Sequence, residues 1–349
     1  MAKHSPLSSL PLPDRKKDRP GSWGYASGRI WCLEKDLFGR SGLDRLYAAS
    51  SSDEVRRLLL EHRYPQKDTV GDMVMAERCQ VYERLGEMVP DDGFWQIFLL
   101  PADVANIKTG LKLSILGEDP GEEEFESRLT RPSLVGHELL WQALIREDTE
   151  ACACLPPWAG LMVQRAREAY AQVFDPAAID RSLDRDLHSL TADLAADLQD
   201  PWLTGYYDRV RDLHNLEALL RARHRRISRE QLTLALLPEG LIGHEALLGC
   251  LGADDACTQV FSGPYRELAV FLGSFGEKGG PRLFAREKDG LLAEYMRQGL
   301  AVLSGAPRVI AFVMAREFEF KNIRIALAGL ENGLDETVIL PLRRDFNKN

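Results

Sequence analysis

The segment Asp103-Val-Ala-Asn106-Ile-Lys108 decides the fold, because two closely similar segments occur later in the chain. They are Asp212-Leu-His-Asn215-Leu-Glu217 and Glu319-Phe-Lys-Asn322-Ile-Arg324. The spacing between successive asparagines is nearly the same in both intervals. A regular step of roughly 108 residues indicates three copies of one structural unit.

A second repeated segment has the same spacing. Leu134-Val-Gly136-His137-Glu138 returns as Leu241-Ile-Gly243-His244-Glu245, so its two glycines are separated by the same step. The interval from each glycine to the next asparagine is identical, and the same interval counted back from Asn106 reaches Ser27. We therefore expect the first unit to begin near Tyr25. The spacing predicts one compact three-lobed body, with a disordered head at residues 1–22 and helical repeats at residues 25–133, 134–240 and 241–349.

Apolar residues recur at helical spacing, as in Val55, Leu58 and Leu59 and again from Leu292 to Leu303. Alternating strand patterns are almost absent. Ser51 and the Ser228-Arg-Glu-Gln231 capping box are typical helix starts. The sequence thus predicts an all-α fold. Solenoid repeats are usually about 30 to 50 residues long, so three larger units favour closure around a pseudo-threefold axis.

Composition restricts the function. The chain has 349 residues, 45% of them hydrophobic, and a formal net charge of −9, which argues against a protein whose main role is gripping nucleic acid. No apolar run could span a bilayer and no signal peptide opens the chain, so we expect a cytosolic protein. The six cysteines form no CxxC pair, which favours reduced, buried thiols over a zinc site or a disulfide framework.

Two interpretations of the repeated acid and asparagine stay open. The acid and the asparagine lie one helical turn apart on the same face. In one interpretation they are buried polar residues satisfied by a neighbouring helix. In the other, three such faces line a polar seat for a partner around a shared central opening. The basic run from Arg221 to Arg229 is either a solvated helix face or a docking site for an acidic partner.

No catalytic motif is present. His137-Glu138 and His244-Glu245 would need a second histidine four residues after the first to form HExxH, but Trp141 and Leu248 occupy those positions. Phosphate-binding loops and nucleophile elbows are absent as well. We therefore predict no enzyme activity, no metal and no cofactor.

The chain resembles the C subunit of the rotary V/A-type ATPases, which is equivalent to the d subunit of vacuolar proton pumps. The resemblance rests on the triplicated asparagine segments, on the helix expected from Tyr25 to Phe38 and on the Ser51 helix leading into Tyr64. It covers roughly residues 25–349. The proline-rich head lies outside the pattern, and Glu217 stands where the sibling repeats have Lys108 and Arg324.

The resemblance implies a funnel-shaped, non-catalytic rotor subunit on the cytoplasmic face of the membrane. Its partners would be the central-stalk subunits and the membrane rotor ring of ion-carrying subunits, with no nucleic acid and no transmembrane segment of its own. It would transmit torque during proton or sodium transport. The residues expected to face the central opening and bind a partner are Asp103, Asn106, Lys108, Asp212, Asn215, Arg221, Arg223, Arg225, Arg226, Glu319, Asn322 and Arg324.

Two other functions are compatible with the residues alone. A helical-repeat scaffold that collects signalling partners would present an extended concave surface. An α-helical enzyme would need a deep pocket with convergent titratable groups.

Overall fold

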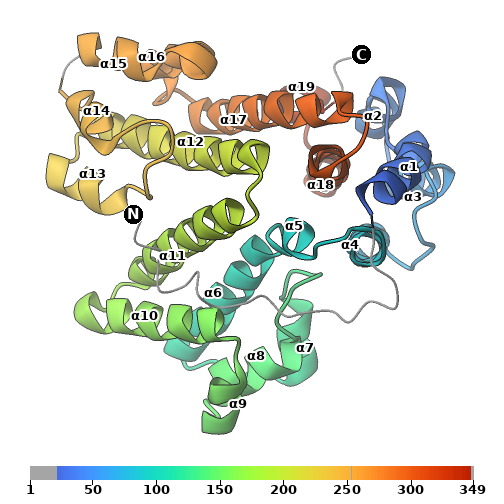
Figure 1. The fold of residues 1–349 in the computed structure, drawn as a ribbon, viewed down its shortest axis with the longest axis horizontal. Coiled ribbons are helices and arrows are strands. Elements are labelled where there is room, and N and C mark those ends of the chain that lie inside the picture. Colours follow the sequence, from blue (N-terminus) through green and yellow to red (C-terminus); the bar gives the residue numbers. More distant parts are fainter. Residues whose placement is uncertain (1–21, 253, 347–349) are drawn as a thin grey trace. The chain divides into compact units, whose positions relative to one another are not determined.

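The computed structural model describes residues 22–252 and 254–346, and every regular element in this part of the chain is a helix (Figure 1). The predicted all-α fold is confirmed. The expected disordered head lies outside the described residues, apart from Ser22. The described chain divides into two compact units, a first unit of residues 91–207 and a second unit of residues 22–90 and 208–346. The three-lobed arrangement stays a prediction.

The first unit is organised around three long helices, α6, α10 and α11. Pro101 stands in the first turn of α6, and left-handed Gly117 ends that helix. The Asp175 side chain caps α11 by accepting the Ala177 N–H at 2.9 Å, so α10 and α11 form a hairpin, and α11 also packs on α6. The helices are α5 (Gly93–Gln96), α6 (Leu100–Leu116), α7 (Glu122–Ser127), α8 (His137–Leu144), α9 (Thr149–Cys154), α10 (Pro157–Val173), α11 (Pro176–Asp197) and the start of α12 (Pro201–Arg225).

The second unit consists of an N-terminal and a C-terminal stretch of the chain. Its N-terminal helices are α1 (Trp23–Leu33), η1 (Glu34–Asp36), α2 (Arg40–Tyr47), α3 (Ser52–Glu61) and α4 (Val70–Met88). The rest of α12 leads to α13 (Arg229–Ala235), α14 (His244–Gly249), α15 (Asp254–Val260), η2 (Gly263–Val270) and α16 (Phe271–Ser274). The C-terminal helices are α17 (Gly280–Arg297), η3 (Gln298–Ala301), α18 (Ala306–Glu331), α19 (Glu336–Ile339) and η4 (Leu340–Leu342).

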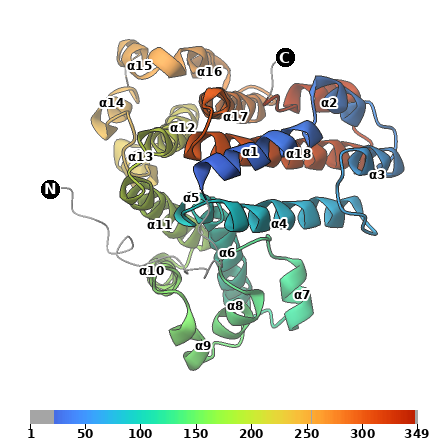
Figure 2. The same cartoon turned by 45° about the vertical axis from the view of Figure 1, so that its right-hand side comes forward.

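Helix α18 forms the centre of this second unit. It packs against α1, α2, α4 and α17, and Figure 2 shows α1 and α4 running alongside it. Ile310, Phe312, Phe320 and Ile323 on different sides of the helix are all buried. A helix that is buried on nearly all sides needs neighbours around most of its circumference, which explains why the helices before residue 90 pack against it.

A second apolar core lies farther along the same unit. Leu213 and Leu216 of α12 pack there with Phe271, Phe275 and Phe284. The ring of Phe284 stands edge-on to the other two, with centroids 5.3 and 5.8 Å away. Such edge-to-face contacts add to the apolar burial that fixes α17 beside α16.

The predicted helix starts are confirmed. Ser51 accepts the Glu54 N–H at 3.3 Å, and Ser228 and Gln231 form the expected reciprocal capping box. The apolar face expected from Leu292 to Leu303 is shorter than predicted. Helix α17 tightens into η3 after Arg297, and Leu303 lies beyond both with 91% of its surface exposed.

Candidate functional site

The repeated asparagine of the first unit binds the backbone of a single distant residue. Asn106 on α6 accepts the Thr130 N–H through Oδ1 at 2.8 Å and donates from Nδ2 to the Thr130 carbonyl oxygen at 3.0 Å. A carboxamide carries both an acceptor and donors, so it can satisfy the two backbone groups of one residue together. We call this two-bond arrangement the asparagine lock.

The same lock occurs in both later repeats. Asn215 on α12 bonds the backbone N–H and carbonyl of Leu237 at 2.8 and 3.2 Å. Asn322 on α18 bonds those of Arg344 at 2.9 and 2.7 Å. All three asparagines are at most 1% exposed. The lock is therefore a buried polar contact repeated three times, and it fastens a loop to a long helix in each case.

The acidic residue one turn before each of the first two asparagines accepts backbone hydrogen bonds from the second repeated segment. Asp103 accepts the N–H groups of Leu134 at 3.0 Å and Val135 at 2.8 Å. Gly136 follows as the N-cap of α8. The two segments that define the repeat in the sequence are thus in direct contact in the structure.

Asp212 makes the matching contacts in the next repeat. It accepts the N–H groups of Leu241 at 3.1 Å and Ile242 at 3.0 Å, just before the Gly243 cap of α14. The Tyr265 hydroxyl adds a third bond at 2.7 Å. Each acid thus bonds two successive backbone amides of the segment that leads into the next helix.

In the third repeat the acid is bonded by a segment from the N-terminal part of the chain. Glu319 accepts the N–H of Phe38, and Gly39 follows as the N-cap of α2, which has eight residues like α8. Gly39 thus takes the place of Gly136 and Gly243, and Ser27, which the spacing reaches, does not. Ser27 instead lies within α1, where its hydroxyl accepts the Gly305 N–H at 3.3 Å.

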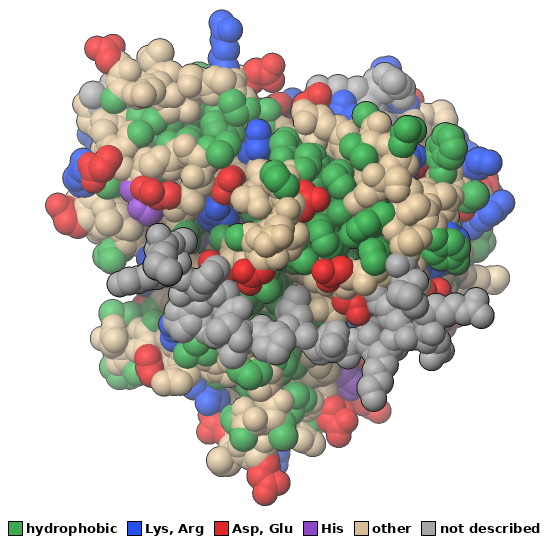
Figure 3. All heavy atoms as spheres, in the orientation of Figure 1, with side chains coloured by type: hydrophobic (Ala, Val, Ile, Leu, Met, Phe, Trp, Pro, Cys, Tyr) green, Lys and Arg blue, Asp and Glu red, His purple; other side chains and the backbone are tan. Residues whose placement is uncertain are grey.

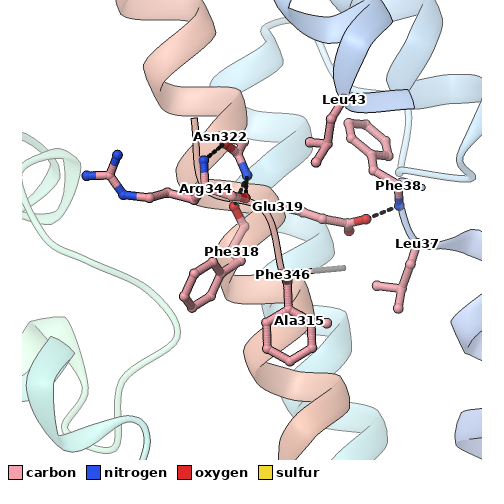
Figure 4. Close-up of a pocket in the computed structure, with 9 residues that line it drawn as sticks. All are labelled: Leu37, Phe38, Leu43, Ala315, Phe318, Glu319, Asn322, Arg344 and Phe346. Atoms are coloured by element: carbon pink, nitrogen blue, oxygen red, sulfur yellow. Dashed lines mark hydrogen bonds between the residues drawn. The ribbon is translucent and has the colours of Figure 1, made fainter. Parts of the chain in front are cut away.

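Figure 4 shows the third lock and a small cavity of about 10 Å³ beside it. The Asn322 carboxamide faces the backbone of Arg344, whereas the Arg344 guanidinium points away and bonds Asp289 at 2.7 Å. Phe318 and Phe346 cover the lock, with ring centroids 5.5 Å apart. The space has the size of one water molecule and offers no room for a substrate.

Burial dominates the electrostatics of the acidic residues. Loss of solvent raises the pKa of Asp103 to about 7, although its backbone hydrogen bonds act in the opposite direction. Burial likewise raises the pKa of Asp212, which its bond from Tyr265 partly offsets. The pKa of Glu319 is raised to about 6 by burial, and Arg316, bonded to it at 2.9 Å, lowers it. These carboxyls are part of a folded interior.

The charge at Glu217 has a structural explanation. Lys108, two residues after Asn106, pairs with Asp184 of α11 at 2.6 Å. Glu217, two residues after Asn215, pairs with Lys288 of α17 at 2.8 Å. The ion pair is therefore retained with its polarity reversed, which accounts for the apparent departure of the middle repeat.

Residues 26–341 match the model of the family described as ATP synthase (C/AC39) subunit. The chain belongs to this family. The resemblance to the C subunit of V/A-type ATPases is thereby confirmed over most of the length. No curated protein matches the sequence of this chain.

The structure places the predicted partner-binding residues in three groups. The repeated acids and asparagines are buried inside their units, as the first interpretation expects, but backbone groups of loops and not a neighbouring helix bond the asparagines. Lys108 and Arg223 are half-buried. The exposed members are Arg221, Arg225, Arg226 and Arg324.

The basic run forms the C-terminal end of α12. Arg221 bonds Glu217 at 2.7 Å, and Arg229 bonds Glu245 at 2.7 Å. Left-handed Arg226, with a φ of 54°, ends the helix. Cations at a helix C-terminus interact favourably with the helix dipole, so the run also stabilises the end of α12.

Sequence reasoning missed the residues that the locks bind. It also missed the partner of Glu319, for which the only signal was Phe38-Gly39, an apolar residue before a capping glycine like Val135-Gly136 and Ile242-Gly243. Among the described residues no group of three or more histidine, cysteine, aspartate or glutamate side chains is placed to hold a metal. None of the helices described is long and apolar enough to span a membrane.

Proposed function

We propose that this C/AC39 subunit is a non-catalytic rotor component of a V/A-type ATPase or ATP synthase. It links the central stalk to the membrane rotor ring and transmits torque between them. The observation that carries this proposal is the family match, which extends over residues 26–341. The subunit would lie on the cytoplasmic face of the membrane, held there through the complex.

The repeated locks support a mechanical role. A torque-bearing part must resist movement of its loops relative to its long helices. Each lock satisfies buried backbone groups of a loop from a side chain on a helix, and releasing it would leave those groups without partners. Three locks of one design therefore stiffen the body at corresponding positions.

We infer that the exposed end of α12 contributes to docking an acidic partner. Arg225 and Arg226 are both exposed, and arginine forks match carboxylates well. On the face drawn in Figure 3, basic and acidic side chains are interspersed, without a broad field of one sign. The proposed contact is thus a local site, with Arg221 and Arg324 as further exposed candidates.

Affinity purification from native membranes tests the proposed function. A tagged copy of the full chain, expressed in its own cells and extracted with mild detergent, should be recovered with the stalk and ring subunits. Purification without any ATPase subunit would contradict the proposal. Cross-linking mass spectrometry of the recovered complex would then identify the surfaces in contact.

A charge-reversal pair tests the docking surface separately. Arg225→Glu combined with Arg226→Glu should weaken recovery of the complex roughly tenfold in buffer of low ionic strength. Arg282→Glu provides the control, since Arg282 is also exposed and the change in charge at each position is the same. Unchanged recovery of the double variant, with normal folding, would exclude this end of α12 from the interface.

A further inference from the structure

A pocket of about 240 Å³ lies at the edge of the second apolar core, within the second unit. The end of α12, the residue after the α14 cap, and α16 with the two residues that follow it form its walls. We call it the α12 pocket. His224, Gly273 and Gly276 line it and are all exposed, so it is open to solvent. The other lining residues are Leu220, Arg223, Leu251, Leu272 and Phe275.

The polar wall of the α12 pocket is positively charged. Arg223 and His224 form this wall, and none of the described residues that line the pocket is acidic. Arg225 and Arg226 follow directly in the chain and are exposed, so they add positive charge at the same end of α12. A wall of this kind attracts anions and repels amines.

The dipole of α12 acts against an anion at this place, because a helix C-terminus carries about half an elementary negative charge. Two of the last carbonyl groups are already bonded. The Ile227 N–H donates to the Ala222 carbonyl oxygen at 3.1 Å, and the Arg226 N–H donates to that of Arg223 at 3.2 Å. The full charge of the Arg223 guanidinium exceeds the dipole charge, so the field in the pocket stays positive.

The Arg223 side chain is held in place by the core behind the pocket. Its Nη1 donates to the Sγ of Cys257 at 3.4 Å and also bonds the Cys250 carbonyl oxygen. Both cysteines are buried as the sequence predicts, but the same prediction is wrong for Cys32 and Cys154, which are exposed. A guanidinium that is fixed before a ligand arrives reduces the entropy cost of binding.

The imidazole of His224 is placed by the absence of a side chain at Gly276. A Cβ atom on Gly276 would lie 2.3 Å from Nδ1 and 2.4 Å from Cε1 of His224, so only glycine lets the ring lie against this backbone. Within the described part of the chain the ring makes no hydrogen bond or ion pair. Its nitrogens are therefore available to a ligand in the pocket.

The opposite wall of the α12 pocket is apolar. Leu220 and Phe275 are buried members of the second apolar core, and Leu251 and Leu272 pack against it. The volume lies just below the usual range of ligand pockets, about 300 to 1,000 Å³, so the ligand must be small. It should combine a negatively charged group with a short apolar body.

We propose that the α12 pocket binds a small organic phosphate, a phosphate monoester with a short apolar body. Such a group carries nearly two negative charges at neutral pH and three acceptor oxygens, which match a guanidinium and an imidazole that stand side by side. A carboxylate has one charge and two oxygens, so it fits Arg223 and His224 less well. The proposal does not depend on the rotor function, and its test measures binding to the isolated chain.

Phenyl phosphate is the probe for this class of ligand. Isothermal titration calorimetry of the full chain in phosphate-free buffer should show saturable one-to-one binding, with a dissociation constant of about 1 mM or lower. Inorganic phosphate lacks the apolar body and phenol lacks the charge, so each should bind roughly tenfold more weakly. A failure of phenyl phosphate to bind would overturn the site. Equal affinity for either of the other two compounds would overturn the ligand class.

Gly273→Leu tests whether the probe occupies the α12 pocket. A Cβ atom on Gly273 meets nothing within 4 Å, so the new side chain enters open space without disturbing the fold. We expect it to weaken binding of phenyl phosphate tenfold or more. Gly28→Leu is the matched control, because Gly28 is also exposed, has nothing within 4 Å and lies on α1 outside the pocket. Undiminished binding by Gly273→Leu would show that the probe binds elsewhere.

Arg223→Gln tests the charged wall and should weaken binding tenfold or more. Arg282→Gln removes the same charge at an exposed position of α17 outside the pocket and should leave binding unchanged. Equal effects of the two substitutions would contradict a specific site. Circular dichroism checks the fold, because Arg223 also bonds the core. If Arg223→Gln does not fold, His224→Gln at the exposed position replaces it, and unchanged binding by that variant would overturn the proposal.

Discussion

Asn322 and Arg344 are joined by two hydrogen bonds between a side chain and a backbone. The Arg344 N–H donates to Oδ1 of Asn322 at 2.9 Å, and Nδ2 of Asn322 donates to the Arg344 carbonyl oxygen at 2.7 Å. The Tyr47 hydroxyl gives Oδ1 a further bond at 2.8 Å. The last described segment of the chain is thus fixed to the central helix of its unit by one carboxamide.

Asn322→Ala should therefore destabilise the protein by about 2 to 4 kcal/mol, because it leaves buried backbone groups of Arg344 without partners. Urea unfolding followed by circular dichroism measures the change. Asn332→Ala, just past the end of the same helix, is the matched control. Its side chain is exposed and bonds only the Ala328 carbonyl oxygen, so a loss of no more than about 0.5 kcal/mol is expected. Equal losses would show that the lock contributes nothing specific.

The ion pairs Lys108–Asp184 and Glu217–Lys288 have opposite polarity, which predicts that the two charges of the first pair can be exchanged. Lys108→Glu should cost about 1 kcal/mol of unfolding free energy, because it places a second acid beside Asp184. Adding Asp184→Lys should recover most of that loss, since Glu217 and Lys288 already form an ion pair of reversed polarity two residues after the asparagine of the middle repeat. A double-mutant cycle measured by urea unfolding gives the coupling. A double variant as unstable as the sum of the single ones would contradict this explanation of Glu217.

The raised pKa of Asp103 predicts that the stability of the protein depends on pH. Its pKa is about 7 in the folded protein and 3.8 in an unfolded chain, so the folded state binds more protons between these values. Its contribution is fully present below the unfolded pKa and is lost as pH rises through the folded pKa. Within that window the unfolding free energy should fall by about 1.4 kcal/mol per pH unit from this group alone.

The Asp103→Asn variant isolates that contribution. Asparagine does not titrate, so the unfolding free energy of the native chain minus that of the variant should decrease from about pH 4 to pH 7. Subtraction removes the effect of Asp212 and Glu319, which keep their own raised pKa values in both proteins. A difference that is flat across this range, or that increases with pH, would contradict the assignment.

The sequence predicts the helices, several of their caps and the repeat, because each depends on neighbouring residues. It does not predict what the locks bind. Asn106, Asn215 and Asn322 bond the backbone of Thr130, Leu237 and Arg344, and these three side chains have nothing in common. A contact to the backbone leaves the partner side chain unconstrained, so no residue pattern marks the bonded position.

The sequence does not predict the partner of Glu319 either, for a different reason. Phe38 lies 281 residues before Glu319, whereas the segments bound by Asp103 and Asp212 follow those acids in the chain. Counting residues assumes that each copy is completed by the segment that follows it. The third copy is completed by the segment that opens the chain, and only the folded structure reveals this closure.

The last prediction concerns Gly240, whose backbone lies close to the repeated acid Asp212. A Cβ atom at Gly240 would lie 2.5 Å from Oδ1 of Asp212 and closer still to the carbonyl oxygen of Asp208. Because backbone cannot move aside as a flexible side chain does, Gly240→Ala should cost about 3 kcal/mol and displace the loop that carries Leu241. Gly28→Ala in α1 meets nothing within 4 Å and should stabilise the protein by up to about 1 kcal/mol. Thermal unfolding of both variants distinguishes the two effects, and a Gly240→Ala protein as stable as the native chain would mean that the Asp212 site is not packed against its loop in this way.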